Sequence, residues 1–120
     1  MNKILLIDDS FYACKVLKDI LSSKYEIVIA RSGIEAEKVF INEKPDLTLL
    51  DVILPEGEAE GVRVLKEIKK LDANAKVIIV SATNLDYVIE ECKNCGIIDY
   101  IVKPYDTGKL IDLIAKVFEE

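Results

Sequence analysis

Several of the apolar runs in this chain end in side chains that carry charge or donate hydrogen bonds. These side chains belong to Asp8, Asp9, Asp51, Ser81 and Lys103. In an open parallel sheet the carboxyl ends of the strands lie along one edge, and binding sites form outside that edge where the strand order reverses. If each run is a strand and the strand order is 2-1-3-4-5, the first and third strands are neighbours. Three carboxylates then converge at this edge, with one ammonium group and one hydroxyl nearby. The sequence therefore predicts a polar site at this edge.

Three carboxylates at short range cannot all stay ionised without a counter-charge. Either one of the acids takes up a proton, or a cation binds between them. A few oxygen ligands beside a phosphate-sized space suit Mg²⁺, which keeps several waters and is typically held by one or two carboxylates and phosphate oxygens. The metal explains more of the pattern, so we expect Mg²⁺ to bind among Asp8, Asp9 and Asp51.

Each of these residues also has an ordinary structural explanation. Asp8 and Asp9 precede Ser10 and could simply cap a helix, and Asp51 alone would more often be a loop acid. Ser81 could be a cap or a turn residue, and a lysine before proline usually starts a turn. These explanations weaken because they must all hold at once.

The elements that position these residues follow from the spacing of apolar residues. Five runs predict strands buried on both faces: Ile4–Ile7, Tyr25–Ala30, Leu47–Leu50, Lys76–Val80 and Tyr100–Val102. Between them apolar residues recur at helical spacing, as in Leu17, Ile20 and Leu21. Ser32-Gly33 opens the second helix, and Gly96 closes the fourth. Strict alternation of strand and helix predicts an α/β fold with a parallel sheet covered on both sides.

Composition limits the classes of protein that this chain can represent. A chain of 120 residues, 51% hydrophobic and 32% charged, predicts one compact domain over residues 1–120. Its net charge of −6 opposes binding to nucleic acid or to an anionic membrane surface. Three cysteines and no histidine form neither a disulfide framework nor a zinc site. No apolar run has the length of a signal-peptide core or a membrane span, so we expect a cytoplasmic protein.

Taken together, the motifs resemble the receiver domains of two-component response regulators. The matching segments are Ile4–Asp9, Leu49–Pro55, Ser81-Ala82 and Gly96–Pro104. Each segment is weak evidence alone, but their order and spacing are highly specific, and the resemblance covers the whole chain. It implies a flavodoxin-like (βα)5 three-layer sandwich whose five parallel strands follow the order 2-1-3-4-5.

The resemblance also implies a chemical role for each matching residue. Asp51 would be the phosphoacceptor, a carboxylate nucleophile that forms an acyl phosphate. Asp9, Asp51 and the backbone carbonyl of Ile53 would bind Mg²⁺ directly, while Asp8 would act through a water. Lys103 would pair with a phosphoryl oxygen.

A conformational switch is implied by the same resemblance. Ser81 would move to donate a hydrogen bond to the new phosphate, with the backbone amide of Ala82 as a second donor. Tyr100 would turn inward as Ser81 moves, and the Lys103-Pro104 peptide bond would be cis. The face made by the fourth helix, the fifth strand and the fifth helix would then change. Exposed residues on the fourth and fifth helices are candidates for partner contact, such as Tyr87, Glu91, Lys109 and Asp112. Taken singly, each of them is better explained as part of an ordinary solvated face.

The expected function is therefore that of a phosphoacceptor receiver in a two-component or phosphorelay system. The domain would catalyse its own phosphorylation from a phosphohistidine donor and its own slow dephosphorylation, without being an enzyme in the usual sense. Its partners would be a sensor histidine kinase or a histidine phosphotransfer protein, and a downstream protein target. We expect no output domain in this chain, and no direct contact with nucleic acid or membrane.

Two features depart from the pattern of the family. The loop that contains Glu56–Glu60 is longer and more acidic than the resemblance leads us to expect, and we interpret it as a tolerated surface insertion beside the phosphorylation edge. Ile53 and Thr83 occupy positions that influence hydrolysis of the acyl phosphate in this family. Because the side chain of Ile53 cannot orient a water, we expect a long-lived phosphorylated form.

Other functions fit the sequence less well. The nearest alternative is a receiver-like interaction module that does not depend on phosphorylation. An aspartate-nucleophile phosphatase needs an acid where the chain has Ile53, and the acids after the first strand would repel the phosphate of a flavin. A redox role rests only on Cys92 and Cys95, which share a helical stripe with Leu85 and Val88 and are better explained as core residues.

Overall fold

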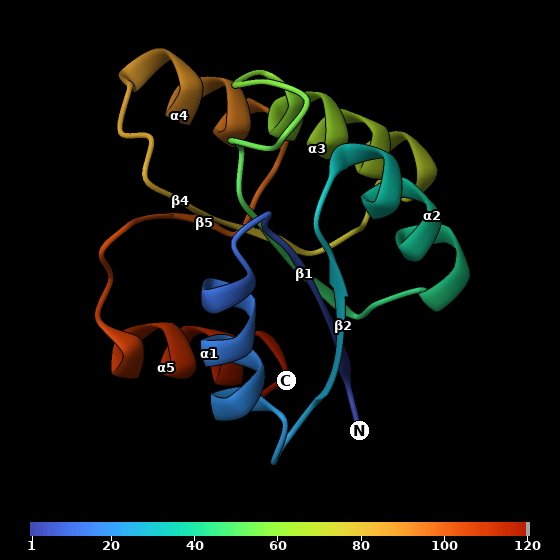
Figure 1. Ribbon diagram of the computed structural model, residues 1–120, viewed down its shortest axis with the longest axis vertical. Helices are drawn as coiled ribbons and strands as arrows, with labels where there is room; N and C mark the ends of the chain where they lie inside the picture. The colour runs from blue at the N-terminus through green and yellow to red at the C-terminus, as the bar shows by residue number, and fades with distance from the viewer. Residues whose placement is uncertain (120) are drawn as a thin grey trace.

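Five strands alternate with five helices along the chain, as the apolar runs predict (Figure 1). The computed structural model describes residues 1–119, so Glu120, the last residue of the expected domain, lies outside the described residues. In chain order the elements are β1 Lys3–Ile7, α1 Phe11–Leu21, β2 Glu26–Ala30, α2 Gly33–Glu43, β3 Leu47–Leu50, α3 Glu60–Leu71, β4 Val77–Ser81, α4 Asp86–Asn94, β5 Asp99–Val102 and α5 Thr107–Val117. All five predicted strands are present, with ends that differ from the prediction by at most one residue.

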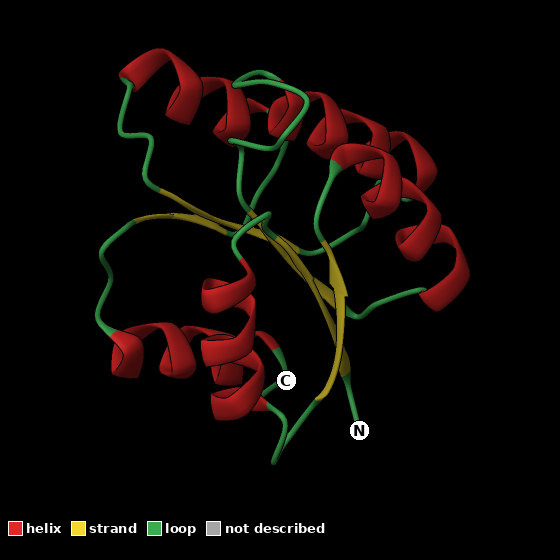
Figure 2. Cartoon of the chain, in the orientation of Figure 1, coloured by secondary structure: helices red, strands yellow, loops and turns green. Residues whose placement is uncertain are grey.

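The strands form one parallel sheet in the order β2-β1-β3-β4-β5. Leu6 in the middle of β1 lies opposite Ile29 of β2 on one side and Leu49 of β3 on the other. Helices α2, α3 and α4 cover one face of the sheet, and α1 and α5 cover the other (Figure 2). The predicted three-layer fold and its strand order are confirmed.

Burial on both faces explains why the strand sequences are almost continuously apolar. In β1, Leu5 and Ile7 pack in the core beneath α2, α3 and α4, whereas Ile4 and Leu6 pack in the core beneath α1 and α5. These four side chains are at most 2% exposed. A polar residue at any of these positions would lose its water, which is costly. Thr48 in β3 is buried nevertheless, whereas charged residues occur only at or beyond the ends of the strands.

Side-chain caps fix where three of the helices begin. Ser10 accepts a hydrogen bond from the backbone N–H of Ala13, Ser32 does so from Glu35, and Asp106 does so from Lys109. Such caps satisfy amides that have no partner within the helix. Ser10, rather than Asp8 or Asp9, therefore caps α1, which leaves both acids in the short segment between β1 and α1.

Two apolar side chains that helical periodicity predicts to be buried are exposed. Ile20 is 36% exposed, although Leu17 and Leu21 beside it in α1 are buried. Leu85 is 50% exposed because it is the N-cap residue of α4, so it does not continue the stripe that contains Cys92. The spacing identifies a buried stripe correctly, but its width depends on how the sheet covers each helix.

Gly61 allows α3 to start directly against the end of β3. Its backbone N–H donates to the carbonyl oxygen of Val52 at 3.0 Å, and a Cβ atom at this position would collide with the Val52 backbone. We expect Gly61→Ala to lower the free energy of unfolding by about 1–3 kcal/mol, because the backbone must shift to make room. Urea denaturation followed by circular dichroism measures this loss.

Gly108→Ala is the matched control, since Gly108 is also the second residue of its helix. The nearest atom to its added Cβ would be the capping carboxylate of Asp106 at 3.3 Å, which needs only a small shift and no backbone movement. This variant should unfold within about 0.5 kcal/mol of the wild type. Equal losses in the two variants would contradict a specific backbone collision at Gly61.

Candidate functional site

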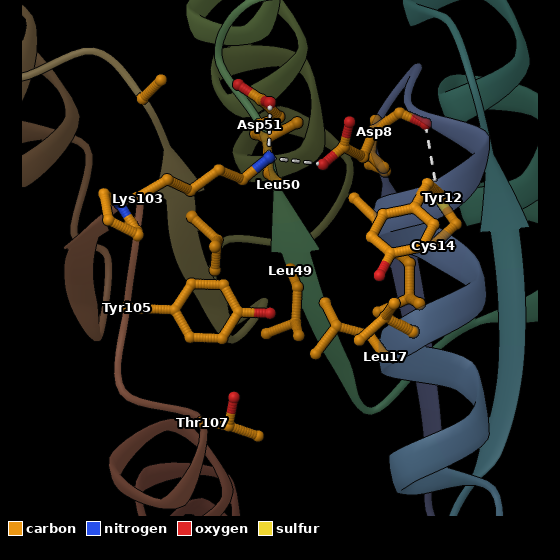
Figure 3. A pocket seen from close by; sticks show the side chains of 17 residues that line it. Asp8, Tyr12, Cys14, Leu17, Leu49, Leu50, Asp51, Lys103, Tyr105 and Thr107 are labelled. Carbon is orange, nitrogen blue, oxygen red and sulfur yellow. Dashed lines mark hydrogen bonds and ion pairs between the residues drawn. The ribbon is translucent and has the colours of Figure 1, made fainter.

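The ammonium group of Lys103 lies between two carboxylates at the carboxyl edge of the sheet (Figure 3). Its Nζ donates to Oδ2 of Asp8 at 2.8 Å and to Oδ2 of Asp51 at 3.2 Å. Asp8 follows β1, Asp51 follows the adjacent β3, and Lys103 follows β5. The backbone N–H of Lys103 donates to the carbonyl oxygen of Ser81, which aligns the end of β5 with β4. The strand order thus brings these groups together, as predicted.

Asp51 is the central acid of this site. It is 8% exposed, and its Oδ1 accepts from the Ser81 hydroxyl at 2.8 Å and from the backbone N–H of Ile53 at 2.9 Å. Together with Lys103, these donors engage both oxygens of the carboxylate. A nearly buried carboxylate is stable in its charged form only when it is paired and hydrogen-bonded in this way.

Lys103 supplies the positive charge of the site. Burial lowers the pKa of the Lys103 ammonium, but the hydrogen bond and charge of Asp8, together with those of Asp51, outweigh burial and raise it. The lysine therefore remains protonated at neutral pH. One ammonium against two carboxylates leaves this group of three side chains with a net charge of −1.

Asp9 stands apart from the other predicted residues. It is exposed, and among residues 1–119 no hydrogen bond or ion pair joins it to Asp8, Asp51 or Lys103. Within the same residues, no three side chains of Asp, Glu, Cys or His gather as a metal-binding group. The structure therefore brings four predicted residues together and leaves Asp9 at the rim. Lys103 itself provides a counter-charge that we expected a metal ion to provide.

The chemistry of the donors nevertheless fits a hard divalent cation. Oxygen atoms of Asp8 and Asp51 already flank one cationic atom, the Nζ of Lys103, at 2.8 and 3.2 Å. Carboxylate oxygens are also the protein ligands that Mg²⁺ prefers, with waters completing its shell. The two carboxylates therefore converge on a place that accepts positive charge.

A second chain of contacts leads from Asp51 to β5. The Ser81 hydroxyl, which donates to Asp51, accepts from the backbone N–H of Thr83 at 3.3 Å. The Tyr100 hydroxyl in turn donates to the carbonyl oxygen of Thr83 at 2.7 Å. Burial raises the pKa of the Tyr100 hydroxyl, so it remains a donor. The role of Thr83 could not be predicted, because a backbone group gives no residue-type signal.

A cavity of about 510 Å³ adjoins the charged groups (Figure 3). It lies between α1 and the segment that joins β5 to α5, and Tyr12 and Tyr105 line its sides. Leu17 and Leu49 belong to its apolar lining, whereas Asp51 and Lys103 line the polar end. The Lys103-Pro104 peptide bond beside it is cis, as the resemblance implies. Residue types alone do not indicate this cavity, because it depends on how two segments distant in sequence diverge.

The environments of the three thiols do not favour redox chemistry. Cys14, Cys92 and Cys95 are all free, and Cys14 and Cys92 are buried. Burial raises the pKa of each buried thiol to about 11, which disfavours the reactive thiolate. The prediction that Cys92 is a core residue is confirmed, and Cys95 packs against the same core. These environments argue against a disulfide reductase.

A doubly wound sheet with acids after β1 and β3, a hydroxyl at the end of β4 and a lysine after β5 defines a receiver-type domain. Comparison with known proteins leads to the same class. Residues 4–115 match the response regulator receiver domain family, and this chain belongs to that family. It is a two-component signalling domain and not a metabolic enzyme.

Individual relatives match over almost their whole length. The chemotaxis protein CheY of Thermotoga maritima is 34% identical over 118 residues, which cover 97% of each chain. Sporulation initiation phosphotransferase F of Bacillus subtilis is 32% identical, covering 96% of this chain and 92% of the relative. A two-component response regulator from Clostridium difficile superposes with a TM-score of 0.92 at 28% identity, covering 100% and 98% of the two chains.

A further structural relative was solved in an assembly. The CheX-CheY-BeF3-Mg²⁺ complex from Borrelia burgdorferi contains a chain that is 30% identical, with a TM-score of 0.85. The alignment covers 98% of the present chain and 89% of that chain. The similarity in fold is to one chain of that complex. The ligands and the partner named for the complex are those of the Borrelia burgdorferi protein.

Removal of the Lys103 charge should expose the repulsion between the two acids. At pH 7 we expect Lys103→Met to lower the free energy of unfolding by about 2 kcal/mol, less than for a fully buried pair because the lysine side chain is 26% exposed. The repulsion needs both acids, so the loss should shrink when Lys103→Met is made in an Asp8→Asn background. Urea denaturation with and without Asp8→Asn measures it.

Lys15→Met provides the control, because Lys15 forms an exposed ion pair with Asp19 at 3.2 Å. It should change stability by less than about 0.5 kcal/mol in either background. A Lys103→Met loss that is the same with and without Asp8→Asn would show that packing, and not charge, is the main contribution of Lys103.

Proposed function

We propose that this chain is a phosphoacceptor receiver in which Asp51 accepts a phosphoryl group from a phosphohistidine donor. The observation that carries the proposal is the environment of the Asp51 carboxylate. It is 8% exposed, and Lys103, Ser81 and the amide of Ile53 all donate to it. These donors hold the carboxylate in one orientation, which suits a carboxylate nucleophile.

The groups that now hold Asp51 are also suited to hold a phosphoryl group. When Asp51 attacks the phosphorus atom of the phosphohistidine, the P–N bond breaks and the imidazole of the donor leaves. One carboxylate oxygen of Asp51 thereby becomes part of the acyl phosphate. The ammonium of Lys103 can then pair with a phosphoryl oxygen, and the Ser81 hydroxyl and the Ala82 amide can donate to others. Mg²⁺, bound by Asp9, Asp51 and the Ile53 carbonyl, with Asp8 acting through a water, would offset the negative charge of the phosphoryl oxygens.

The contacts of Ser81 suggest how the signal leaves the site. If Ser81 turns from Asp51 to a phosphoryl oxygen, its contact with Thr83 changes, and with it the carbonyl to which Tyr100 donates. Tyr100 lies in β5, so the change would reach the face formed by α4, β5 and α5. We propose that a downstream protein recognises this face, for which Tyr87, Lys109 and Asp112 are exposed candidates. Glu91 is exposed as well, but its carboxylate pairs with Lys66 of α3 at 3.3 Å and so faces the other side of α4.

Partner proteins are the natural source and target of such a signal. We propose a sensor histidine kinase or a histidine phosphotransfer protein as the donor, because one relative is named a phosphotransferase of sporulation. The complex of CheX with CheY supports a protein as the recipient. No helix within residues 1–119 has the length and apolar character needed to cross a membrane. The cytoplasm is the compartment where we expect these partners to meet.

A receiver-like interaction module that does not depend on phosphorylation is the second candidate. One observation favours it: Lys103 pairs with both Asp8 and Asp51, so the acids are stable without a bound metal. In that case neither Mg²⁺ nor a phosphoryl donor would change the protein.

Phosphorylation separates the two candidates. With Mg²⁺ and acetyl phosphate, the intact mass of the wild type should increase by one phosphoryl group, and the NMR signals of Tyr100 should shift. Asp51→Asn should show neither change, because an amide is not a nucleophile for this reaction. Asp46→Asn is the control, since Asp46 precedes β3 at the opposite edge, where it accepts from the Lys3 backbone. A wild type that stays unmodified favours the interaction module.

The side chain of Ile53 should lengthen the lifetime of the phosphorylated form. It is 37% exposed beside Asp51 and has no group that can orient a water. We expect Ile53→Asn to release phosphate roughly tenfold faster, because an amide can hold the attacking water by a hydrogen bond. A time course of phosphate release, after removal of the donor, compares the two proteins. Equal rates would refute this explanation of the lifetime.

A further inference from the structure

Glu56 fastens the loop between β3 and α3 to the start of α2. Its Oε1 accepts from the backbone N–H of Gly33 at 3.0 Å, and its Oε2 accepts from that of Ile34 at 3.2 Å. These amides belong to the first turn of α2, where no carbonyl of the helix can pair with them. The negative charge also suits the positive end of the helix dipole. The hydrogen bond from Gly33 lowers the pKa of the Glu56 carboxyl, which keeps it ionised.

A second set of contacts ties the start of α3 to α2. The guanidinium of Arg63 donates from two nitrogens to Glu60, each at 2.7 Å, and also to Glu37 of α2 at 2.9 Å. The Glu60 side chain lies so close over Gly33 that a side chain there would collide with it. Exposed ion pairs contribute little stability individually. In this protein the contacts of Arg63 with Glu60 and Glu37 hold the start of α3, and with it the loop, against one side of α2.

The same loop controls the backbone next to Asp51. Within the loop of residues 52–59, residues 54–57 form a closed turn, in which the N–H of Gly57 donates to the carbonyl of Leu54 at 2.9 Å. Directly before this turn, the N–H of Ile53 donates to Oδ1 of Asp51 at 2.9 Å. Glu56 lies in the turn, three residues after Ile53. A force that holds Glu56 in place therefore also limits the movement of Ile53.

We propose that Glu56 is a positioning residue for the site at Asp51. By anchoring residues 52–59 to α2, it holds both backbone groups of Ile53 in place. One is the N–H that donates to Asp51, and the other is the carbonyl that we assign as a Mg²⁺ ligand. This inference rests on the proposed function. It gives the long acidic loop a role, because ligand affinity depends on how well outer contacts orient the groups that bind.

Glu56→Gln tests the inference with the smallest change of shape. The amide retains one acceptor, but its NH2 group faces a backbone N–H of α2 and cannot accept from it. Glu58→Gln is the matched control, since it removes the same charge from the same exposed loop. Among residues 1–119 no hydrogen bond or ion pair involves the Glu58 side chain. Circular dichroism and urea denaturation verify that both variants are folded.

Two measurements report on the anchor. Titration of the ¹⁵N-labelled proteins with MgCl2 gives the Kd for Mg²⁺, which should rise about fivefold in Glu56→Gln and remain unchanged in Glu58→Gln. Hydrogen exchange without Mg²⁺ should become faster at the amides of Gly33, Ile34 and Ile53 in Glu56→Gln alone.

The outcomes distinguish this inference from the proposed function. If the wild type binds Mg²⁺ and the two variants have the same Kd, Glu56 does not position the site, and the proposed function stands. Unchanged exchange at Ile53 in Glu56→Gln would also overturn the inference. If the wild type shows no response to Mg²⁺, the proposed function fails, and the role of Glu56 toward the metal fails with it.

Discussion

The electrostatic constraint at the carboxyl edge of the sheet determines much of the surrounding structure. Asp8 and Asp51 are brought close because β1 and β3 are neighbours, and two carboxylates at that range need a positive charge. Lys103 provides it, and the backbone contact between Lys103 and Ser81 keeps the lysine at the end of β5. The order of the strands and the charge of the site therefore depend on each other.

Asp51 is the point from which two lines of contacts spread through the protein. One passes through Ser81 and the backbone of Thr83 to Tyr100 in β5. The other passes through the amide of Ile53 to the turn that contains Glu56, whose carboxylate accepts from the first amides of α2. A change in what the Asp51 carboxylate accepts would thus be felt on two sides of the domain. The first line leads to the face proposed for partner binding, while the second stabilises the site itself.

The fold and four site residues were predictable because they depend on residue type and position along the chain. Strands buried on both faces are almost continuously apolar, with Thr48 of β3 as an exception, and the polar residues at their carboxyl ends lie at the sheet edge, which locates Asp8, Asp51, Ser81 and Lys103. Contacts made by backbone groups, such as the carbonyl of Thr83, leave no mark in the sequence. The strand order itself came from the resemblance, since apolar runs do not say which strands are adjacent.

Glu56 shows a different limit of sequence analysis. Its position in an acidic loop predicts only that Glu56 belongs to a surface insertion, and the residue is indeed exposed. Its carboxylate, however, binds amides of α2, whose distance from the loop is set by the folded sheet. Added loop length costs little conformational entropy, so the insertion is tolerated whether or not the loop is anchored.

An anchored loop differs from a mobile one in that its charged side chains form hydrogen bonds or ion pairs with the rest of the protein. Here the helix amides take up the charge of Glu56, and Arg63 takes up that of Glu60. The acidic loop can therefore lie beside Asp51 while two of its negative charges are paired with donors outside the site.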